Sequence, residues 1–112
     1  MNDDYHATSI FFVYNSFTTP STVYKYHLGN HHREVFFQKE LRDKNFKSED
    51  YVSERIWATA NDGSKIPVSI VYRKGTDLKN APCLLYGYGS YGYTLPDVFS
   101  PTRLSLLDRG FV

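Results

Sequence analysis

Short β-rich runs separated by tight turns constrain the fold of this 112-residue chain more than any other feature. The first half holds three such runs, at residues 9–16, 22–28 and 33–41, with turn sequences between them. Runs with this short spacing are typical of antiparallel strands joined in chain order. The sequence therefore predicts a three-stranded antiparallel meander in this half.

Two further β-rich runs, 51–60 and 65–75, flank the sequence Asn-Asp-Gly-Ser at 61–64. An Asp-Gly pair between two such runs is a strong signal for a β-hairpin, because glycine readily takes the positive φ that a tight turn needs. Pro67 cannot donate to a β-ladder, which favours an edge position for the second strand. The polar segment 42–51 before the hairpin has no periodicity and is predicted to be a linker.

The last part of the chain combines an apolar run, a glycine-rich loop and a short helical pattern. The run APCLLY leads into YGYGSYG (86–92), here called the Gly/Tyr loop, and predicts a strand over 81–89 that ends in the glycines. The closing sequence LSLLDRGFV (104–112) predicts a short amphipathic helix, a glycine turn and the first residues of another strand. Since a domain rarely finishes where a strand begins, we expect the chain to be a fragment.

Composition narrows the range of functions. A net charge of +1 gives no electrostatic basis for binding nucleic acid or an anionic membrane, and no apolar run reaches membrane-spanning length. Cys83 is the single cysteine, so no internal disulfide can form, which fits a reducing compartment. The first nine residues lack the basic and apolar parts of a signal peptide. These features predict a cytoplasmic protein with no nucleic-acid or membrane partner.

The glycines of the Gly/Tyr loop, Gly87, Gly89 and Gly92, match the G-x-G-x-x-G pattern of dinucleotide sites. Such a site needs a helix directly after the glycines, because the helix N-terminus binds the pyrophosphate. The sequence YTLPDVFSPT follows instead, and Pro96 and Pro101 exclude one long helix there. A dinucleotide site is therefore disfavoured, and no cofactor is expected.

Three other groups of residues could carry chemistry but have simpler explanations. Ser90 does not sit in a G-x-S-x-G elbow, since Tyr88 replaces the first glycine, and it is predicted to be a turn residue. Cys83 has no basic neighbour in sequence that would activate it and is predicted to be a packed core thiol. A single loose group of histidines lacks the two ligand pairs of a zinc site and is predicted to be a solvated turn without metal: His27, His31 and His32.

A glycine-rich loop directly after a buried strand has a further interpretation. Glycine lets a backbone approach a ligand closely or adopt positive φ, and a phenol is a neutral hydrogen-bond donor on a rigid ring. In α/β-hydrolases the loop after the third strand supplies part of the oxyanion hole. The order found here, a hairpin followed by an apolar run and then the glycines, fits that position.

Four segments together resemble the prolyl oligopeptidase family of serine peptidases, and most of all its oligopeptidase B (protease II) branch. These segments are STVYKYHL, YVSERIWATANDGSKIPVSIVYRKG, LLYGYGSYG and RLSLLDRGFV. The resemblance implies a mostly β fragment, in which last-blade strands of a seven-bladed β-propeller join the first strands of an α/β-hydrolase domain. Residues 1–44 would be the propeller strands with the start of the linker, and residues 45–112 the N-terminal part of the catalytic domain, truncated before the nucleophile.

The same resemblance implies a function. The parent protein would hydrolyse short peptides after Lys or Arg through an acyl-enzyme, without a cofactor. Tyr88 would donate its hydroxyl to the oxyanion, with Gly87 and Gly89 as supporting loop residues, while the nucleophile, acid and base would lie outside this chain. A severed fragment of this kind is expected to be inactive alone and to self-associate through exposed strand edges. The alternative is a non-catalytic β-rich module that binds a peptide or protein partner through those edges.

Overall fold

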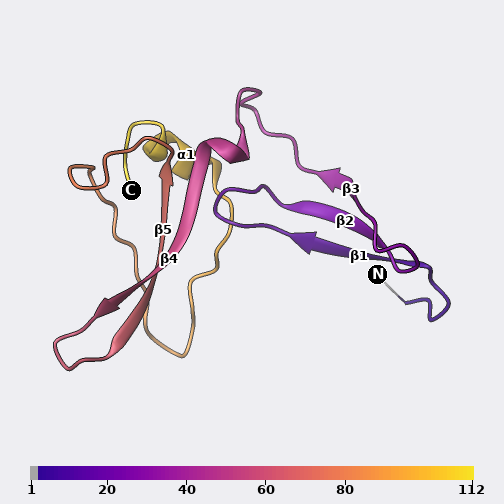
Figure 1. Cartoon of the computed structure of the whole chain (residues 1–112), viewed down its shortest axis with the longest axis horizontal. Coiled ribbons are helices and arrows are strands. Elements are labelled where there is room, and N and C mark those ends of the chain that lie inside the picture. The colour runs from indigo at the N-terminus through magenta and orange to yellow at the C-terminus, as the bar shows by residue number, and fades with distance from the viewer. Residues whose placement is uncertain (1–2) are drawn as a thin grey trace.

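The computed structural model describes residues 3–112 and forms two antiparallel sheets followed by one helix. The three-stranded sheet lies on one side of the molecule, and the two-stranded hairpin lies on the other, with the helix near the end of the hairpin that faces away from its turn (Figure 1). The elements are β1 (Ser9–Tyr14), β2 (Thr22–His27), β3 (Arg33–Gln38), the short 3-10 helix η1 (Ser48–Asp50), β4 (Tyr51–Thr59), β5 (Lys65–Arg73) and α1 (Pro101–Leu107).

The first sheet confirms the predicted meander, because its strands pair antiparallel in the order β1-β2-β3. A register shift at Val23/Tyr24 places a bulge in the pairing of β2 with β3. Thr22, at the start of β2, is fully buried. Its hydroxyl donates to the Pro20 carbonyl at 2.8 Å and accepts from the Gln38 amide at 2.7 Å. This buried hydroxyl therefore ties the ends of β2 and β3 to the turn before them.

The predicted hairpin is also confirmed, since β4 and β5 pair along their whole length with Trp57 opposite Pro67. Gly63 has φ +86, a conformation that favours glycine, and its N–H donates to the Ala60 carbonyl at 2.9 Å. The Ser64 N–H donates to the Asp62 carboxylate at 2.9 Å. The backbone N–H groups of the turn thus find hydrogen-bond acceptors within the turn, as the Asn-Asp-Gly sequence predicts.

The C-terminal pattern gives helix α1 and a glycine turn, as predicted, but the helix begins at Pro101 rather than at Leu104, and the strand expected to begin after the turn is not formed by residues 111–112. Pro101 begins the helix, where its missing N–H costs nothing, and Leu104 and Leu107 are its buried residues. Gly110 has φ +84 and its N–H donates to the Leu107 carbonyl at 3.0 Å. The two buried leucines are the hydrophobic core within residues 3–112.

The predicted strand over 81–89 is wrong. One parallel bridge is present at this segment: the Leu84 N–H donates to the Val112 carbonyl, and the Val112 N–H donates to the Pro82 carbonyl, both at 2.9 Å. A strand needs a ladder of such pairs, and residues 3–112 supply only this one to the segment. Cys83, at the centre of the bridge, is exposed, so the prediction of a packed core thiol is wrong as well. No described element covers this face of the segment.

The segment 42–51, predicted to be a linker, is anchored on both sides. The Phe46 ring stacks on Tyr51 with centroids 5.6 Å apart and meets Phe99 edge to face at 5.3 Å. The Ser48 hydroxyl donates to the Thr18 carbonyl at 2.6 Å, across to the turn between β1 and β2. The polar composition of the segment gave no signal for this ordered structure. A few aromatic and hydroxyl contacts are enough to fix a segment that is otherwise charged.

Arg103 on α1 adds a second connection between the two sides of the molecule. Its guanidinium lies 4.9 Å from the centre of the Phe17 ring and donates to the Val98 carbonyl at 2.9 Å. Burial lowers the pKa of Arg103, while the carboxylate of Asp97 acts in the opposite direction. No helix within residues 3–112 is long and apolar enough to cross a membrane.

Candidate functional site

The Gly/Tyr loop leaves the Cys83–Val112 bridge as irregular backbone and turns sharply after Ser90. Gly87 and Gly89 do not adopt positive φ, and a Cβ atom built on either one meets nothing within 4 Å. Positive φ occurs at Gly92 (φ +63) instead. Positive φ is therefore not the reason for glycine at positions 87 and 89, whereas Gly92 serves the turn.

The turn spans Ser90 to Tyr93, with the Tyr93 N–H donating to the Ser90 carbonyl at 3.1 Å. Its two central residues, Tyr91 and Gly92, have φ of 56° and 63°, as in a type I′ turn. Ser90 is thus a turn residue, as predicted. Helix α1 begins only at Pro101, so the glycines do not open a helix as a dinucleotide site requires.

Aromatic side chains surround a hollow of about 530 Å³ beside this turn, lined by Tyr86, Tyr88, Tyr91, Tyr93 and Leu95. The rings of Tyr88 and Tyr93 meet edge to face, with centroids 5.9 Å apart and planes at 80°. Sequence reasoning selected Tyr88 but missed Tyr93 and Leu95. The signal for Tyr93 was its place directly after the Tyr91-Gly92 pair, because a tight turn brings the residues on its two sides together.

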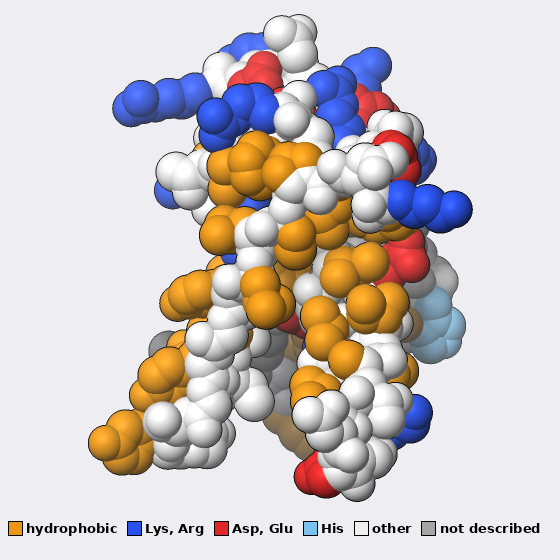
Figure 2. Space-filling model, turned by 90° about the vertical axis from the view of Figure 1, so that its left-hand side faces the viewer, with side chains coloured by type: hydrophobic (Ala, Val, Ile, Leu, Met, Phe, Trp, Pro, Cys, Tyr) orange, Lys and Arg blue, Asp and Glu red, His pale blue; other side chains and the backbone are white. Residues whose placement is uncertain are grey.

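The Tyr88 hydroxyl is available to a ligand. The residue is 51% exposed, and its hydroxyl has no hydrogen-bond partner among residues 3–112. The hollow beside it has no charged lining residue. Figure 2 looks onto the side of the molecule where β4 and β5 lie, and it shows hydrophobic side chains over the lower part of this face and charged ones at its upper end. The hollow can therefore offer a neutral donor among side chains that carry no charge.

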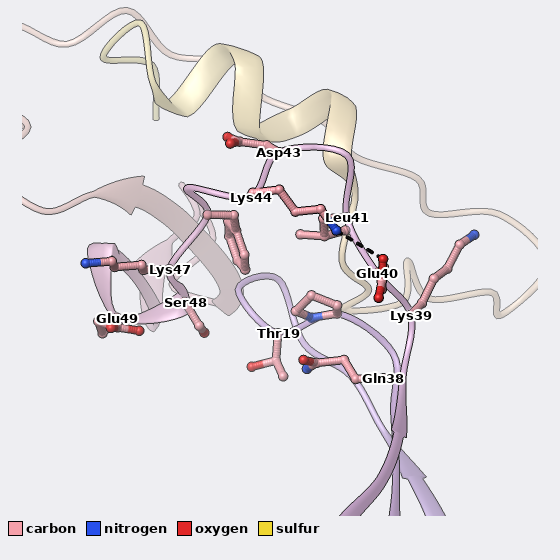
Figure 3. A pocket seen from close by; sticks show the side chains of 12 residues that line it. Thr19, Gln38, Lys39, Glu40, Leu41, Asp43, Lys44, Lys47, Ser48 and Glu49 are labelled. Carbon is pink, nitrogen blue, oxygen red and sulfur yellow. Dashed lines mark hydrogen bonds and ion pairs between the residues drawn. The ribbon is translucent and has the colours of Figure 1, made fainter.

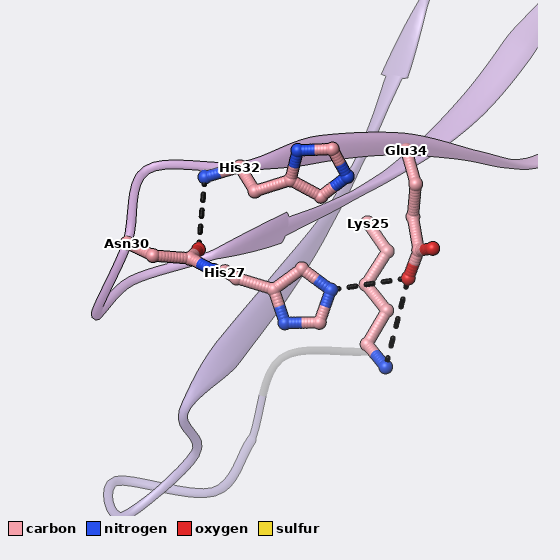
Figure 4. Close-up of polar contacts among 5 residues, drawn as sticks. All are labelled: Lys25, His27, Asn30, His32 and Glu34. Atoms are coloured by element: carbon pink, nitrogen blue, oxygen red, sulfur yellow. Dashed lines mark hydrogen bonds and ion pairs between the residues drawn. The ribbon is translucent and has the colours of Figure 1, made fainter.

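The histidines have polar neighbours in the β2–β3 hairpin (Figure 4). His27 Nε2 lies 3.1 Å from the Glu34 carboxylate, which also pairs with Lys25 Nζ at 4.0 Å. The hydrogen bond with His27 is the main cause that lowers the pKa of Glu34. Tyr26 and His31 are hydrogen-bonded at 2.7 Å between the phenol and Nδ1. Within residues 3–112, no group of three ligand-type side chains could hold a metal ion.

A second hollow, of about 410 Å³, lies between the end of β3 and the linker (Figure 3). Its lining mixes three lysines with three carboxylates, and the ion pair of Lys44 with Glu40, at 3.0 Å, lies within it. Charges of both signs in one open hollow favour no particular ligand chemistry. We do not regard it as a functional site.

Tyr51 shows the opposite situation to Tyr88. Its hydroxyl donates to Asp108 Oδ1 at 2.7 Å, and Arg73 lies 3.5 Å from the same oxygen. Burial, followed by the hydrogen bond to Asp108, raises the pKa of Tyr51 to about 12. The contact joins the start of β4 to the end of α1. Sequence patterns gave no signal for it, because the partners lie far apart in the chain.

No family model matches the chain, but curated proteins and solved structures do. It is 44% identical over 103 residues to dipeptidyl aminopeptidase BI of Pseudoxanthomonas mexicana, covering 90% of this chain and 14% of that protein. The structure of oligopeptidase B from Leishmania major matches with a TM-score of 0.77 and 38% identity, covering 96% of this chain and 15% of that one. Prolyl oligopeptidase B from Galerina marginata, bound to a 35mer hydrolysis and macrocyclization substrate, matches with a TM-score of 0.80 and 26% identity, covering 96% and 15%.

These matches define the class of protein, a mostly β piece that corresponds to parts of the propeller and hydrolase domains of serine oligopeptidases. The chain belongs to the prolyl oligopeptidase family and lies close to oligopeptidase B within it. The predicted family and fold class are thereby confirmed. The chain spans about one seventh of the length of the relatives it matches.

Proposed function

We propose that this chain is the part of a serine oligopeptidase that supplies the oxyanion-hole tyrosine, Tyr88. The parent enzyme hydrolyses short peptides after Lys or Arg through an acyl-enzyme and works in the cytoplasm without a cofactor. The observation that carries the proposal is that Tyr88 is half-exposed, has no hydrogen-bond partner for its hydroxyl within residues 3–112 and lies between two glycines with open space around them. The peptide-bound Galerina relative supports a peptide substrate.

In this proposal the chain contributes to one step of the reaction. When the nucleophile attacks the scissile carbonyl, negative charge develops on the carbonyl oxygen, and the Tyr88 hydroxyl donates a hydrogen bond to it. The missing side chains at Gly87 and Gly89 let the peptide backbone come close to the loop. Residues 1–44 would be the C-terminal strands of the propeller domain with the start of the linker, and residues 45–112 the N-terminal part of the catalytic domain, truncated before the nucleophile. The Ser, Asp and His of the triad are supplied by other parts of the parent.

The test is Tyr88→Phe in the full-length enzyme that carries this segment. The substitution keeps the ring and removes one donor, which matters most when the carbonyl oxygen is charged. Loss of one oxyanion-hole donor lowers kcat by roughly 10²- to 10³-fold. KM is expected to change little, because the ground-state carbonyl is a weaker acceptor. Steady-state kinetics on one fluorogenic dibasic peptide measure both constants.

Tyr86→Phe and Tyr91→Phe are the matched controls, since each removes a hydroxyl from the same loop. Both are expected to retain most of kcat. A collapse of kcat in either control, with Tyr88→Phe near the parental value, would assign the donor to the wrong tyrosine. The 112-residue chain alone is expected to hydrolyse no peptide and to react with no fluorophosphonate probe. Stoichiometric labelling of Ser90 would instead make the loop a nucleophile site.

A second candidate function is a β-rich module that binds a partner through its strand edges. The observation in its favour is the exposed apolar side chains on the two outer strands of the first sheet, among them Val13, Val35, Phe36 and Phe37. Outer strands with unsatisfied backbone groups pair with other chains. Light scattering of the 112-residue chain over a concentration series is expected to show self-association. A compact monomer at high concentration would contradict both this candidate and the proposed division at residues 44/45.

A further inference from the structure

We infer that Tyr93 is the positioning residue that aims the Tyr88 hydroxyl at the reacting carbonyl. The inference rests on the proposed role of Tyr88. The Tyr93 ring meets the Tyr88 ring edge to face, 5.9 Å between centroids and 80° between planes, which is the favoured geometry for an aromatic pair. Within residues 3–112 it is the one aromatic ring in such contact with Tyr88.

Tyr88 has few other restraints. Its neighbours in sequence are Gly87 and Gly89, which have no side chains to limit its rotation, and its hydroxyl has no hydrogen-bond partner within residues 3–112. Within residues 3–112, no hydrogen bond therefore fixes the direction of this half-exposed phenol. The edge-to-face contact with Tyr93 is therefore the observed interaction that selects one direction for the ring.

The turn between the two tyrosines exists at a conformational cost. Tyr91 holds φ 56°, a value that is uncommon for a residue with a side chain, and it is 98% exposed, so packing does not compensate. What this conformation achieves is the reversal of the chain between Ser90 and Tyr93, closed by their 3.1 Å hydrogen bond. The reversal brings Tyr93 back beside Tyr88. The strained conformation of Tyr91 therefore supports the Tyr88–Tyr93 ring pair and not a contact of Tyr91 itself.

Positioning has a specific kinetic consequence. An oxyanion donor is effective because it already points at the place where charge will develop, so no reorganisation is needed during the reaction. A donor that rotates must first be oriented, and this cost falls on the transition state. Loss of Tyr93 should therefore lower kcat and leave KM nearly unchanged, and only when the Tyr88 hydroxyl is present.

A double-mutant cycle in the full-length enzyme tests this coupling. Tyr93→Leu is expected to lower kcat about 10-fold, the order that one aromatic pair can supply. Tyr93→Phe keeps the ring and should rescue kcat. In the Tyr88→Phe background, Tyr93→Leu should cause no further loss, because no hydroxyl remains to be aimed. Phe12→Leu, which removes a ring pair with Tyr24 (centroids 5.4 Å apart) from the first sheet and leaves the Gly/Tyr loop untouched, is the control and should leave kcat unchanged.

The outcomes separate this inference from the proposed function. If Tyr88→Phe has no effect, the proposed function fails and the inference fails with it. If Tyr88→Phe is costly but Tyr93→Leu is silent, or equally harmful in both backgrounds, only the inference is overturned. Should Tyr93→Leu fail to fold, Gly92→Val takes its place. It disrupts the turn through φ +63 without adding a clash, and the same loss of effect in the Tyr88→Phe background is expected.

Discussion

Tyr51 and Tyr88 carry the same phenol in opposite surroundings. The Tyr51 hydroxyl is bonded to Asp108 beside the buried face of α1, while the Tyr88 hydroxyl has no partner within residues 3–112 and stands in an open loop. A donor satisfied inside the fold contributes to stability and has little left to offer a ligand. A donor left open contributes little to stability and can bind one. The hydrogen bond of Tyr51 thus stabilises the region around α1, whereas the Gly/Tyr loop leaves a donor open to a ligand.

The largest difference between the two regions should appear when the same substitution is made in each. Leu107 is 2% exposed on α1, and Leu85 is 83% exposed just before the loop. Leu107→Ala removes buried contacts and is expected to lower the free energy of unfolding by about 2–5 kcal/mol. Leu85→Ala should change the free energy of unfolding of the unsubstituted protein by no more than about 0.5 kcal/mol. Urea unfolding followed by circular dichroism measures both, and equal losses would refute the contrast.

A smaller effect is expected from the aromatic contacts. Phe46→Leu keeps an apolar side chain but loses the ring pairs with Tyr51 and Phe99, each worth about 0.5–1.5 kcal/mol. Tyr93→Leu removes a single ring pair, in the exposed loop, and should therefore lower the free energy of unfolding by about half as much. The same unfolding assay compares them. A Tyr93→Leu loss larger than that of Phe46→Leu would mean that the loop is a structural element.

A last effect depends on pH: it is present at neutral pH and disappears in alkaline solution. The pKa of Tyr51 is raised from its ordinary value of 10.0 to about 12, so the folded state favours the neutral phenol. Its contribution to stability is complete below about pH 10, where the phenol is protonated in both states, and is lost as pH rises through about 12. Tyr51→Phe should therefore cost most below pH 10 and progressively less above it.

The measurement compares the unfolding midpoints of the unsubstituted protein and of Tyr51→Phe across this pH range. Tyr91→Phe is the control, because its side chain is almost fully exposed. A difference between the parent and Tyr51→Phe that stays constant from neutral to strongly alkaline pH would show that the Tyr51–Asp108 hydrogen bond does not contribute in solution.

Local sequence signals predicted the elements whose hydrogen bonds are made between residues close together in the chain. The β4–β5 hairpin followed from its Asn-Asp-Gly turn, and α1 with its glycine turn followed from the leucine spacing before Gly110. The prediction of a strand over 81–89 was wrong because a strand needs a partner segment to pair with. A run of apolar residues carries no information about which segment that is. For the same reason Cys83 was expected to be buried and is exposed.

The candidate site, too, could be predicted from the sequence only in part. Tyr88 and its glycines were found through the resemblance of YGYGSYG to a known loop, and the structure adds that positive φ belongs to Tyr91 and Gly92 rather than to Gly87 or Gly89. The Tyr88–Tyr93 ring pair could not be predicted, because it depends on the type of turn between them. The Tyr51–Asp108 and Arg103–Phe17 contacts join distant segments, which no local pattern records.

The bridge between Cys83 and Val112 has a consequence for how the backbone opens. The amides of Leu84 and Val112 are both hydrogen-bonded across it, and the connection between them runs through the Gly/Tyr loop and α1. A parallel pair cannot separate by fraying from an adjoining turn, as an antiparallel hairpin does. Exchange of these two amides with solvent deuterium therefore reports one shared event, the release of Val112 from Pro82 and Leu84. The segment that leads into the Gly/Tyr loop and the residue that closes the chain therefore open together.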